Sequence, residues 1–315
     1  MKRIPKIAYL LVGALALVGC APVANDTVVI ATHDSFVISE ELKAQFETES
    51  GLKLEIIKAG DAGALTNKLV LTKADPIADA YYGVDNTFIG ALRANGVGEP
   101  GTAKVIDYAD VCFNYDVDWF ARNELAPPAN WQDLTLPAYS GLTVVENPLS
   151  SSTGFAFLIA TIAKYGESGW QRYWTDLKAN GLKVAAGWEA AYYTDFSGSA
   201  GKGDYPIVLS YSSSPADESN TAALLEGCFR QREYAGVLKG AKNPSGAQKL
   251  VTWMQSKVFQ DSVATSMYVY PVDKTAFIPE SWVTKAPRAT STLGSELDID
   301  AGRSAWLKQW SDLFD

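Results

Sequence analysis

The sequence predicts an α/β protein of two lobes joined by crossing strands. Short apolar segments typical of strands alternate with amphipathic segments typical of helices over the first hundred residues, and the alternation resumes after residue 140. Hydrophobic residues make up 47% of the 315-residue chain and charged residues 20%, so the chain can form packed cores. A chain of this length is typical of about two domains.

The first residues are typical of an export signal. Lys2, Arg3 and Lys6 precede an apolar segment, 7–17. That segment is too short to span a hydrocarbon core of roughly 30 Å. We therefore expect the chain to be exported, to the periplasm or to the outer face of the cell membrane.

Residues 17–20, Leu-Val-Gly-Cys, resemble a bacterial lipobox, in which the cysteine is acylated. We expect 1–19 to be a lipoprotein signal peptide, Cys20 to carry lipid, and 20–26 to be a lipid-anchored tether. The alternative is an ordinary secretory signal followed by an unrelated cysteine.

Three strand–helix units follow the tether. The expected elements alternate along the chain as strand 27–31, helix 40–50, strand 52–56, helix 64–73, strand 78–84 and helix 86–95. Gly51 stands where a helix C-terminal glycine belongs. Strands that alternate with helices predict a mainly parallel sheet.

The remaining chain repeats this pattern and supplies segments that connect the lobes. Residues 111–115 are predicted to form a strand, which could cross between lobes, and 228–237 is again extended. The other expected elements are strands 142–145, 182–185 and 207–211, and helices 131–134, 155–165, 167–180, 244–257 and 302–313.

Composition excludes several classes of function. The net charge is −9, from 27 basic and 36 acidic residues, which argues against a nucleic-acid partner and favours cationic ligands. One His and three Cys argue against a zinc site and against most Ser-His-Asp or Cys-His enzymes. The patterns G-x-S-x-G, C-x-x-C and the P-loop are absent from the sequence. We expect a binding protein without a cofactor or a metal; a carboxylate-based hydrolase is the enzyme alternative.

Export places Cys112 and Cys228 in a compartment that permits disulfides. A bond between them is one expectation, and two buried apolar thiols are the alternative.

Ligands of open α/β sheets bind beyond the carboxyl ends of the strands, so the residues after each predicted strand are the candidate site. Aromatic, hydroxyl and acidic side chains are frequent there. The segments are 33–35, 60–61, 84–86, 150–154, 187–188, 211–215 and 268–270.

These segments also carry the motifs of one known family. The motifs are T-H-D-S-F at 32–36, G-V-D-N at 83–86, N-P and a Ser/Thr run at 147–154, G-W-E-A-A-Y at 187–192, V-L-S-Y-S-S-S-P-A at 208–216 and Y-P-V at 270–272. Through them the chain resembles the thiamine-binding proteins, the solute-binding components of thiamine ABC transporters. The matches run in order along nearly the whole mature chain.

The resemblance implies a two-lobed periplasmic-binding-protein fold of type II, with a ligand cleft between lobes joined by crossing strands. It implies lobe 1 at 27–110 plus about 235–315, and lobe 2 at about 111–234. The implied ligand is thiamine or a thiamine phosphate, and the implied partner is an ABC transporter permease. We expect a monomer, attached to the membrane through its lipid.

The implied contacts combine an aromatic side with a phosphate side. We expect ligand contacts from Trp188, Tyr211, Asp61, His33, Asp85, Tyr192, Asp217 and Tyr268, and on the phosphate side from Ser151, Ser152, Thr153 and Gly154. His33 stands where the family usually has Tyr, and so does Asp217. Part of the aromatic clamp is therefore missing, or is supplied by Tyr192, Tyr193 or Tyr268.

The chemistry of thiamine fits these residue types. A thiazolium cation over an aromatic face gains roughly 0.5–2 kcal/mol, and Trp is the best face. Asp61 can accept from the pyrimidine amine or offset the positive charge. The helix that begins near Thr153 offers free N–H groups to a phosphate, unless Ser152 or Thr153 only caps it.

Each of these residues also has a purely structural interpretation. Trp188 could belong to the core, Asp61 could cap the next helix, and His33 could be a hydrogen-bonded structural histidine. Tyr192 and Tyr193 could be packing residues of a helix, and Asp217 could belong to a solvated face.

Ferric-ion binding on the same fold is the alternative function. Tyr192 and Tyr193 with His33 and Asp61 would give phenolate and carboxylate oxygens and one imidazole, which suit a hard cation.

Overall fold

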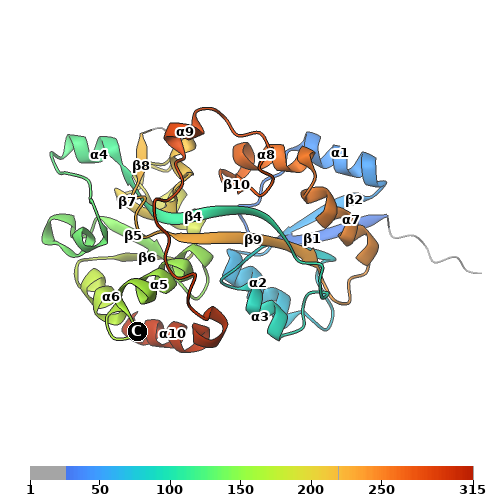
Figure 1. Cartoon of the computed structure of the whole chain (residues 1–315), viewed down its shortest axis with the longest axis horizontal. Coiled ribbons are helices and arrows are strands. Elements are labelled where there is room, and N and C mark those ends of the chain that lie inside the picture. The colour runs from blue at the N-terminus through green and yellow to red at the C-terminus, as the bar shows by residue number, and fades with distance from the viewer. Residues whose placement is uncertain (1–25, 219, 315) are drawn as a thin grey trace, which may run out of the picture.

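The computed structural model describes residues 26–218 and 220–314, and these form a two-lobed α/β protein (Figure 1). The signal peptide and the lipidation predicted at Cys20 lie outside the described residues. Among the residues described, no helix is long and apolar enough to cross a membrane.

Lobe 1 contains the predicted strand–helix units. Their bounds are β1 (Thr27–Thr32), α1 (Glu40–Ser50), β2 (Lys53–Lys58), α2 (Ala62–Leu71), β3 (Ala80–Asp85) and α3 (Ile89–Ala94). Helix α1 begins where the Ser39 side chain accepts from the N–H of Leu42, and ends at Gly51, whose φ of 70° is left-handed. Helices α7 (Pro244–Met254) and α8 (Lys257–Met267) complete the lobe, and its core includes Phe46, Tyr82 and Phe259.

Two long strands connect the lobes, namely β4 (Lys104–Asp116) and β9 (Phe229–Val237). They lie side by side and run in opposite directions across the middle of the molecule (Figure 1). Cys112 of β4 and Cys228, just before β9, are joined by a disulfide bond. The covalent bond therefore ties the two crossing strands to each other.

Lobe 2 repeats the alternation of strand and helix. Its elements are β5 (Thr143–Glu146), α5 (Ser152–Tyr165), α6 (Trp170–Ala179), β6 (Lys183–Ala185), the π-helical turn η3 (Ala190–Asp195) and β7 (Ile207–Tyr211). Every residue of α5 from Ser152 to Ile162 is buried, which makes α5 the central helix of the lobe core. Trp170 and Trp174 of α6 are fully buried beside it.

Shorter elements connect these parts. They are α4 (Val117–Arg122), the 3-10 turns η1 (Trp131–Thr135), η2 (Pro137–Tyr139) and η4 (Ser214–Ala216), β8 (Thr221–Ala223), β10 (Tyr270–Pro271), α9 (Trp282–Lys285) and α10 (Ile299–Phe314).

The described strands form one curled sheet in the order β2-β1-β3-β9-β4-β7-β5-β6, with β8 and β10 beside β4. The expectation of a mainly parallel sheet is wrong at its centre. Pairs β1–β2, β1–β3, β5–β6 and β5–β7 are parallel, whereas β3–β9, β9–β4 and β4–β7 are antiparallel. The reason is that β4 and β9 pass between lobes in opposite directions instead of returning through a helix on one sheet.

Helix α10 contacts both lobes. Trp310 packs edge-on against Trp174 of α6, and the Arg303 guanidinium lies over Phe88 of lobe 1 and Phe155 of lobe 2. The division expected from the sequence assigns 299–314 to lobe 1. We propose instead that α10 moves with lobe 2, because its tryptophan is seated in that core.

Candidate functional site

Three adjoining hollows, with volumes of about 130, 580 and 40 Å³, lie between the lobes; we call them together the cleft. All three are lined by Ser35 and Trp188. Lobe 1 contributes the segments after β1 and β2, and lobe 2 contributes 186–194 and the end of β7. The carboxyl ends of strands thus meet at the cleft, as the strand-end rule predicts.

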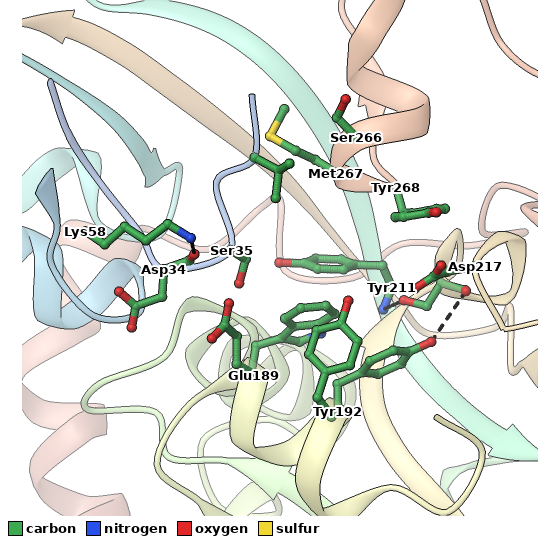
Figure 2. A pocket seen from close by; sticks show the side chains of 14 residues that line it. Asp34, Ser35, Lys58, Glu189, Tyr192, Tyr211, Asp217, Ser266, Met267 and Tyr268 are labelled. Atoms are coloured by element: carbon green, nitrogen blue, oxygen red, sulfur yellow. Dashed lines mark hydrogen bonds between the residues drawn. The ribbon is translucent and has the colours of Figure 1, made fainter. Parts of the chain in front are cut away.

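An aromatic wall of Trp188, Tyr192, Tyr193 and Tyr211 forms one side of the cleft (Figure 2). Trp188 and Tyr192 are stacked, with ring centroids 4.9 Å apart and an interplanar angle of 12°. Tyr193 is edge-on to both, and the Tyr211 ring lies 6.0 Å from the Trp188 ring.

Local sequence explains how this wall is held. Residues 188 and 192 are four apart on one helical turn, so their rings share a face. The Trp188 Nε1–H donates to Ser210 Oγ at 2.9 Å, and the buried Tyr192 hydroxyl donates to the Ser214 carbonyl at 3.4 Å. These bonds fix the orientation of the indole, which has one ring face covered by Tyr192.

Asp61 lies at the contact between the lobes. Its Oδ1 accepts from the N–H of Ala62 at 2.6 Å, so Asp61 caps α2. Its Oδ2 accepts from the N–H of Trp188 at 2.9 Å. Asp61 thus caps a helix, as one interpretation predicts, but only through one carboxylate oxygen. The other oxygen binds the backbone of the aromatic wall at Trp188. The Asp61 side chain also lines two of the hollows.

Carboxyl groups surround the inner end of the cleft. Burial raises the pKa of the Tyr211 hydroxyl well above its usual value, and the charges of Glu233, Asp61, Asp85 and Glu146 raise it further. Burial raises the pKa of Asp85 to about 7 and that of Glu146 well above its usual value, and neither residue lines the cleft. Of the four acids, Asp61 and Glu233 line the cleft and favour positive charge there.

His33 pairs with one of these acids. Its Nε2 lies 3.2 Å from Glu233 Oε2, and its side chain is 12% exposed and lines the smallest hollow. Burial lowers the pKa of His33, but Glu233, with smaller contributions from Asp61 and Asp107, raises it to about 9. His33 is therefore a charged imidazolium at neutral pH, paired with a carboxylate, and it is both a structural and a cleft-lining histidine.

Gly83 makes room for this imidazole. It has a φ of 92°, and a Cβ at this position would lie 1.9 Å from Cδ2 of His33. The glycine of the G-V-D-N segment thus lets the histidine ring lie against β3.

The Ser/Thr run at the start of α5 is mostly buried behind the cleft. Ser151 Oγ and Thr153 Oγ1 lie 2.9 Å apart, and Thr153 Oγ1 donates to Oε2 of the buried Glu146 at 2.8 Å. Ser152 lines the smallest hollow and accepts from Gln231 at 3.2 Å. Gly154 touches the backbone of β5, since a Cβ there would lie 2.4 Å from the carbonyl oxygen of Glu146.

The remaining predicted residues divide into two groups. Asp217 is exposed and, like Tyr268, lines the hollow beside the aromatic wall (Figure 2). Asp85 does not line the cleft: it is fully buried, and its Oδ1 accepts from the N–H groups of Thr87 and Phe88. Of the predicted contacts, Asp85, Ser151, Thr153 and Gly154 line none of the three hollows.

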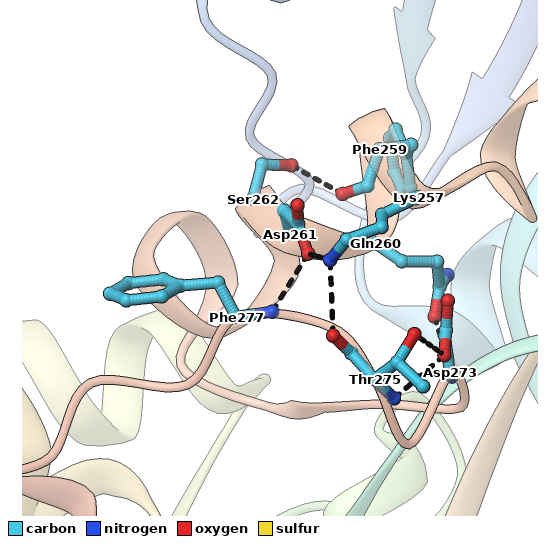
Figure 3. A network of polar contacts seen from close by, with 8 residues as sticks. All are labelled: Lys257, Phe259, Gln260, Asp261, Ser262, Asp273, Thr275 and Phe277. Carbon is cyan, nitrogen blue, oxygen red and sulfur yellow. Dashed lines mark hydrogen bonds and ion pairs between the residues drawn. The ribbon is translucent and has the colours of Figure 1, made fainter.

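A polar network holds the loop after β10 against α8 (Figure 3). Met267, the last residue of α8, lines the cleft. Asp261 Oδ1 accepts from Lys257 Nζ and from the N–H of Phe277, each at 2.7 Å. Tyr268 then leaves the helix with a left-handed φ of 55°. The position of Tyr268 is thus set by how α8 ends.

Ser35 lies in the predicted segment 33–35 and lines all three hollows. Several other lining residues lie outside the predicted segments, namely Lys58, Glu189, Glu233 and Met267. Glu189 directly follows the predicted segment 187–188 and could have been found from it. Glu233 and Met267 could not, because their place depends on the pairing of β9 and on the packing of α8.

The iron alternative finds little support in this geometry. Within the described residues, no group of three or more His, Cys, Asp or Glu side chains is placed to hold a metal ion. Burial raises the pKa of Tyr193 to about 12 and that of Tyr192 further, so both phenols hold their protons. His33 is paired with Glu233, not with either tyrosine.

Comparison with known proteins gives a consistent result. The family model of bacterial extracellular solute-binding proteins matches residues 77–287. The thiamine-binding periplasmic protein of Escherichia coli (strain K12) is 28% identical over 94% of this chain and 96% of its own. The thiamine-binding periplasmic protein of Brucella suis biovar 1 is 29% identical over 96% of this chain and 97% of its own. A solved structure of a periplasmic thiamin binding protein superposes with a TM-score of 0.80 and 26% identity, over 92% of this chain and 96% of that one.

Proposed function

The chain belongs to the bacterial extracellular solute-binding protein family, and from this we propose that it is the thiamine receptor of an ABC importer. It takes up the vitamin in the cleft, outside the cytoplasm, and delivers it unchanged to a permease. The names of its full-length relatives support this ligand.

The aromatic wall is the observation that carries the proposal. A thiazolium ring is flat and permanently positive, and an indole is the aromatic face that holds a cation best. Trp188 is anchored by Ser210 and backed by Tyr192, so little side-chain freedom remains to be lost when a ring stacks on it.

Acidic groups supply the second part of the recognition. Asp61, Glu189 and Glu233 line the hollows next to the wall. Their negative field raises the local concentration of a cation and offsets its charge once it is desolvated. Contacts from both lobes then bury the two sides of the ligand, which a one-sided surface cannot do.

We propose that Cys20 anchors the receptor to the membrane. The Leu-Val-Gly-Cys sequence at 17–20 supports lipidation. Mass spectrometry of membrane-extracted protein tests for the lipid on Cys20 directly. In a second test, the Cys20→Ser variant is expected to be released from the membrane in soluble form.

Titration of the purified protein with thiamine tests the ligand. We expect the tryptophan fluorescence to be quenched at one-to-one stoichiometry, and calorimetry to give the same dissociation constant. Ferric ion, titrated in parallel, is expected to produce no phenolate-to-iron colour. Absence of thiamine binding in both titrations would refute the proposal. Hydrolysis of thiamine by the purified protein would overturn its assignment as a receptor.

A further inference from the structure

We propose that binding of the cationic ligand is coupled to the loss of a proton from His33, through the carboxylate of Glu233. The imidazole proton passes to the solvent, so that one positive charge replaces another beside this carboxylate. The inference rests on the proposed function, since it concerns how the charge of that ligand is balanced in the cleft.

The pair of His33 and Glu233 lies inside the cleft. Nε2 of His33 is 3.2 Å from Oε2 of Glu233, and the two side chains are 12% and 11% exposed. Both residues line the smallest hollow, together with Trp188 and Tyr211 of the aromatic wall. A cation that stacks on Trp188 therefore stands beside an imidazolium and a carboxylate that already balance each other.

Other titratable groups face the imidazole from three elements. Asp61, at the start of α2, has both oxygens bound to backbone N–H groups. The Tyr82 ring of β3 lies 5.5 Å from the imidazole, and its hydroxyl donates to Asp107 of β4 at 2.5 Å. Burial raises the pKa of both Tyr82 and Asp107 well above the usual values. Glu233 raises the pKa of His33 more than Asp61 or Asp107 does, so Glu233 is the principal counter-charge.

The other sides of this hollow add no further charge from the described residues. Met267, at the end of α8, and the following Val269 are apolar. Tyr211 of β7 keeps its phenol proton, because burial raises its pKa well above the usual value. A ligand cation therefore competes with one group, the imidazolium, for the charge of Glu233.

Both members of the pair are held by their neighbours. The imidazole packs directly on Gly83, where a Cβ would lie 1.9 Å from Cδ2 of His33. Oε1 of Glu233 accepts from Nε2 of Gln231 at 3.3 Å. Because both side chains are fixed in place, we expect the pair to respond to a second positive charge by releasing a proton and not by moving apart.

The sign of the coupling follows from these charges. While His33 is protonated, an incoming cation meets a pair of no net charge. Once His33 is neutral, the cation meets an unbalanced carboxylate, and neighbouring charges in a cleft then change the affinity by about tenfold. The ligand must in turn lower the pKa of His33 from its value of about 9 in the free protein. Affinity therefore rises with pH.

Calorimetric titration of the purified protein with thiamine tests the coupling. We expect the dissociation constant to fall about threefold between pH 7 and pH 8.5. At pH 8.5, two buffers of different ionisation enthalpy should report the release of about half a proton per ligand bound. A dissociation constant that is flat or rises over this range would overturn the inference and leave the proposed function intact. If thiamine does not bind at any pH, the proposed function itself fails.

NMR of the natural protein gives a second test that needs no variant. His33 is the only histidine in the chain, so its imidazole signal can be followed with and without thiamine. We expect saturating thiamine to move the midpoint of this titration to lower pH. A midpoint that thiamine leaves unchanged would overturn the coupling.

A matched pair of variants separates the proton of His33 from net charge. His33→Gln removes the imidazolium but keeps an N–H donor for Glu233. We expect it to bind thiamine about three- to tenfold more tightly than the natural protein at pH 7, with no change up to pH 8.5. Weaker binding at pH 7, as a purely structural role predicts, or a surviving pH dependence would overturn the coupling.

Lys58→Gln is the control, because Lys58 is an exposed cation that lines the cleft and not the smallest hollow. This variant removes the same charge from the lining and leaves the pair intact. We expect it to keep the threefold change of the dissociation constant between pH 7 and pH 8.5, as estimated for the natural protein. Loss of the pH dependence in Lys58→Gln would also overturn the coupling.

Discussion

Asp61 Oδ2 accepts a hydrogen bond from the backbone N–H of Trp188, at 2.9 Å across the cleft. One carboxylate thereby caps a helix of lobe 1 and holds the aromatic wall of lobe 2. The bond joins the lobes directly beside the proposed ligand, so separation of the lobes and release of the ligand must break it.

Two substitutions of Asp61 separate its roles. Asparagine caps helices as well as aspartate does, but its amide NH₂ cannot accept from Trp188. We expect Asp61→Asn to keep the helix cap and to weaken thiamine binding about tenfold, since the charged hydrogen bond to the N–H of Trp188 is lost. Asp61→Ala should weaken binding similarly and also lose about 1 kcal/mol of stability. Calorimetry measures the thiamine dissociation constant of each variant, and urea unfolding measures its stability. An unchanged dissociation constant in Asp61→Asn would refute the role of Asp61 in joining the lobes.

Trp188→Ala removes the principal face of the wall. We expect thiamine affinity to fall roughly 10- to 100-fold, because cation–π attraction and stacking are lost, while circular dichroism stays unchanged. Trp119→Ala is the matched control: Trp119 is half-buried against Phe120 and does not line the cleft. Similar losses of affinity in both variants would contradict a specific role for Trp188.

The pair of His33 and Glu233 predicts a pH dependence of stability. Since the pKa of His33 rises from 6.5 to about 9 on folding, its contribution is complete below pH 6.5 and is lost as the pH rises through about 9. Burial raises the pKa of Glu233, but the charge of His33 lowers it by more, so the net shift is downward. The stability that Glu233 contributes is therefore lost only in acid. We expect the free energy of unfolding of the natural protein to decline between pH 6.5 and 9. Over the same pH range, the free energy of unfolding of His33→Gln should decline less.

His33 is the only histidine in the chain, so a single imidazole NMR signal reports on this pair. We expect it to titrate near pH 9. A midpoint near the ordinary 6.5 would show that the pair is not formed in solution.

Gly83→Ala is expected to displace the histidine. Its Cβ would overlap the His33 ring, and its φ of 92° is strained for any other residue. Gly96→Ala is the control, because Gly96 has a φ of 64° with open space around it. We expect Gly96→Ala to cost about 1–2 kcal/mol of unfolding free energy and Gly83→Ala distinctly more, with a shifted His33 titration only in the latter. Equal costs would mean that the ring moves aside freely.

The Cys112–Cys228 disulfide is expected to stabilise the fold. It closes a loop across a sequence separation of 116 residues, which restricts the unfolded chain. Replacement of both cysteines by serine should cost about 2–5 kcal/mol. Urea unfolding with and without reductant tests this. Reductant should lower the free energy of unfolding of the natural protein and leave that of the serine variant unchanged. If reductant changes neither value, the disulfide bond is not formed.

Sequence patterns predict local features of this molecule well. The helix expected at 40–50 is found at Glu40–Ser50, because a serine cap and a left-handed glycine act on neighbouring residues. The cleft segments follow from the general position of ligands at strand ends. Trp188 and Tyr211 line the cleft for this reason.

Contacts between residues far apart in the sequence cannot be predicted from local sequence patterns. Glu233 lies 200 residues from its partner His33, and only the antiparallel pairing of β9 brings them together. The Ser/Thr run was expected to contact the ligand on its phosphate side, yet Ser151 and Thr153 are buried because α5 is surrounded by its core. Asp85 likewise serves the start of α3 instead of the cleft.

The contact of Arg303 with two rings has a mechanical consequence. Its guanidinium carbon lies 4.6 Å from the ring centre of Phe88 and 4.9 Å from that of Phe155, and these rings belong to different lobes. Any rotation that parts Phe88 from Phe155 pulls the cation off one of them. Trp310 meanwhile packs edge-on against Trp174 of α6, so the C-terminal helix is held by contacts with both lobes. A rotation of one lobe away from the other would therefore cost at least one of the two cation–π contacts of Arg303.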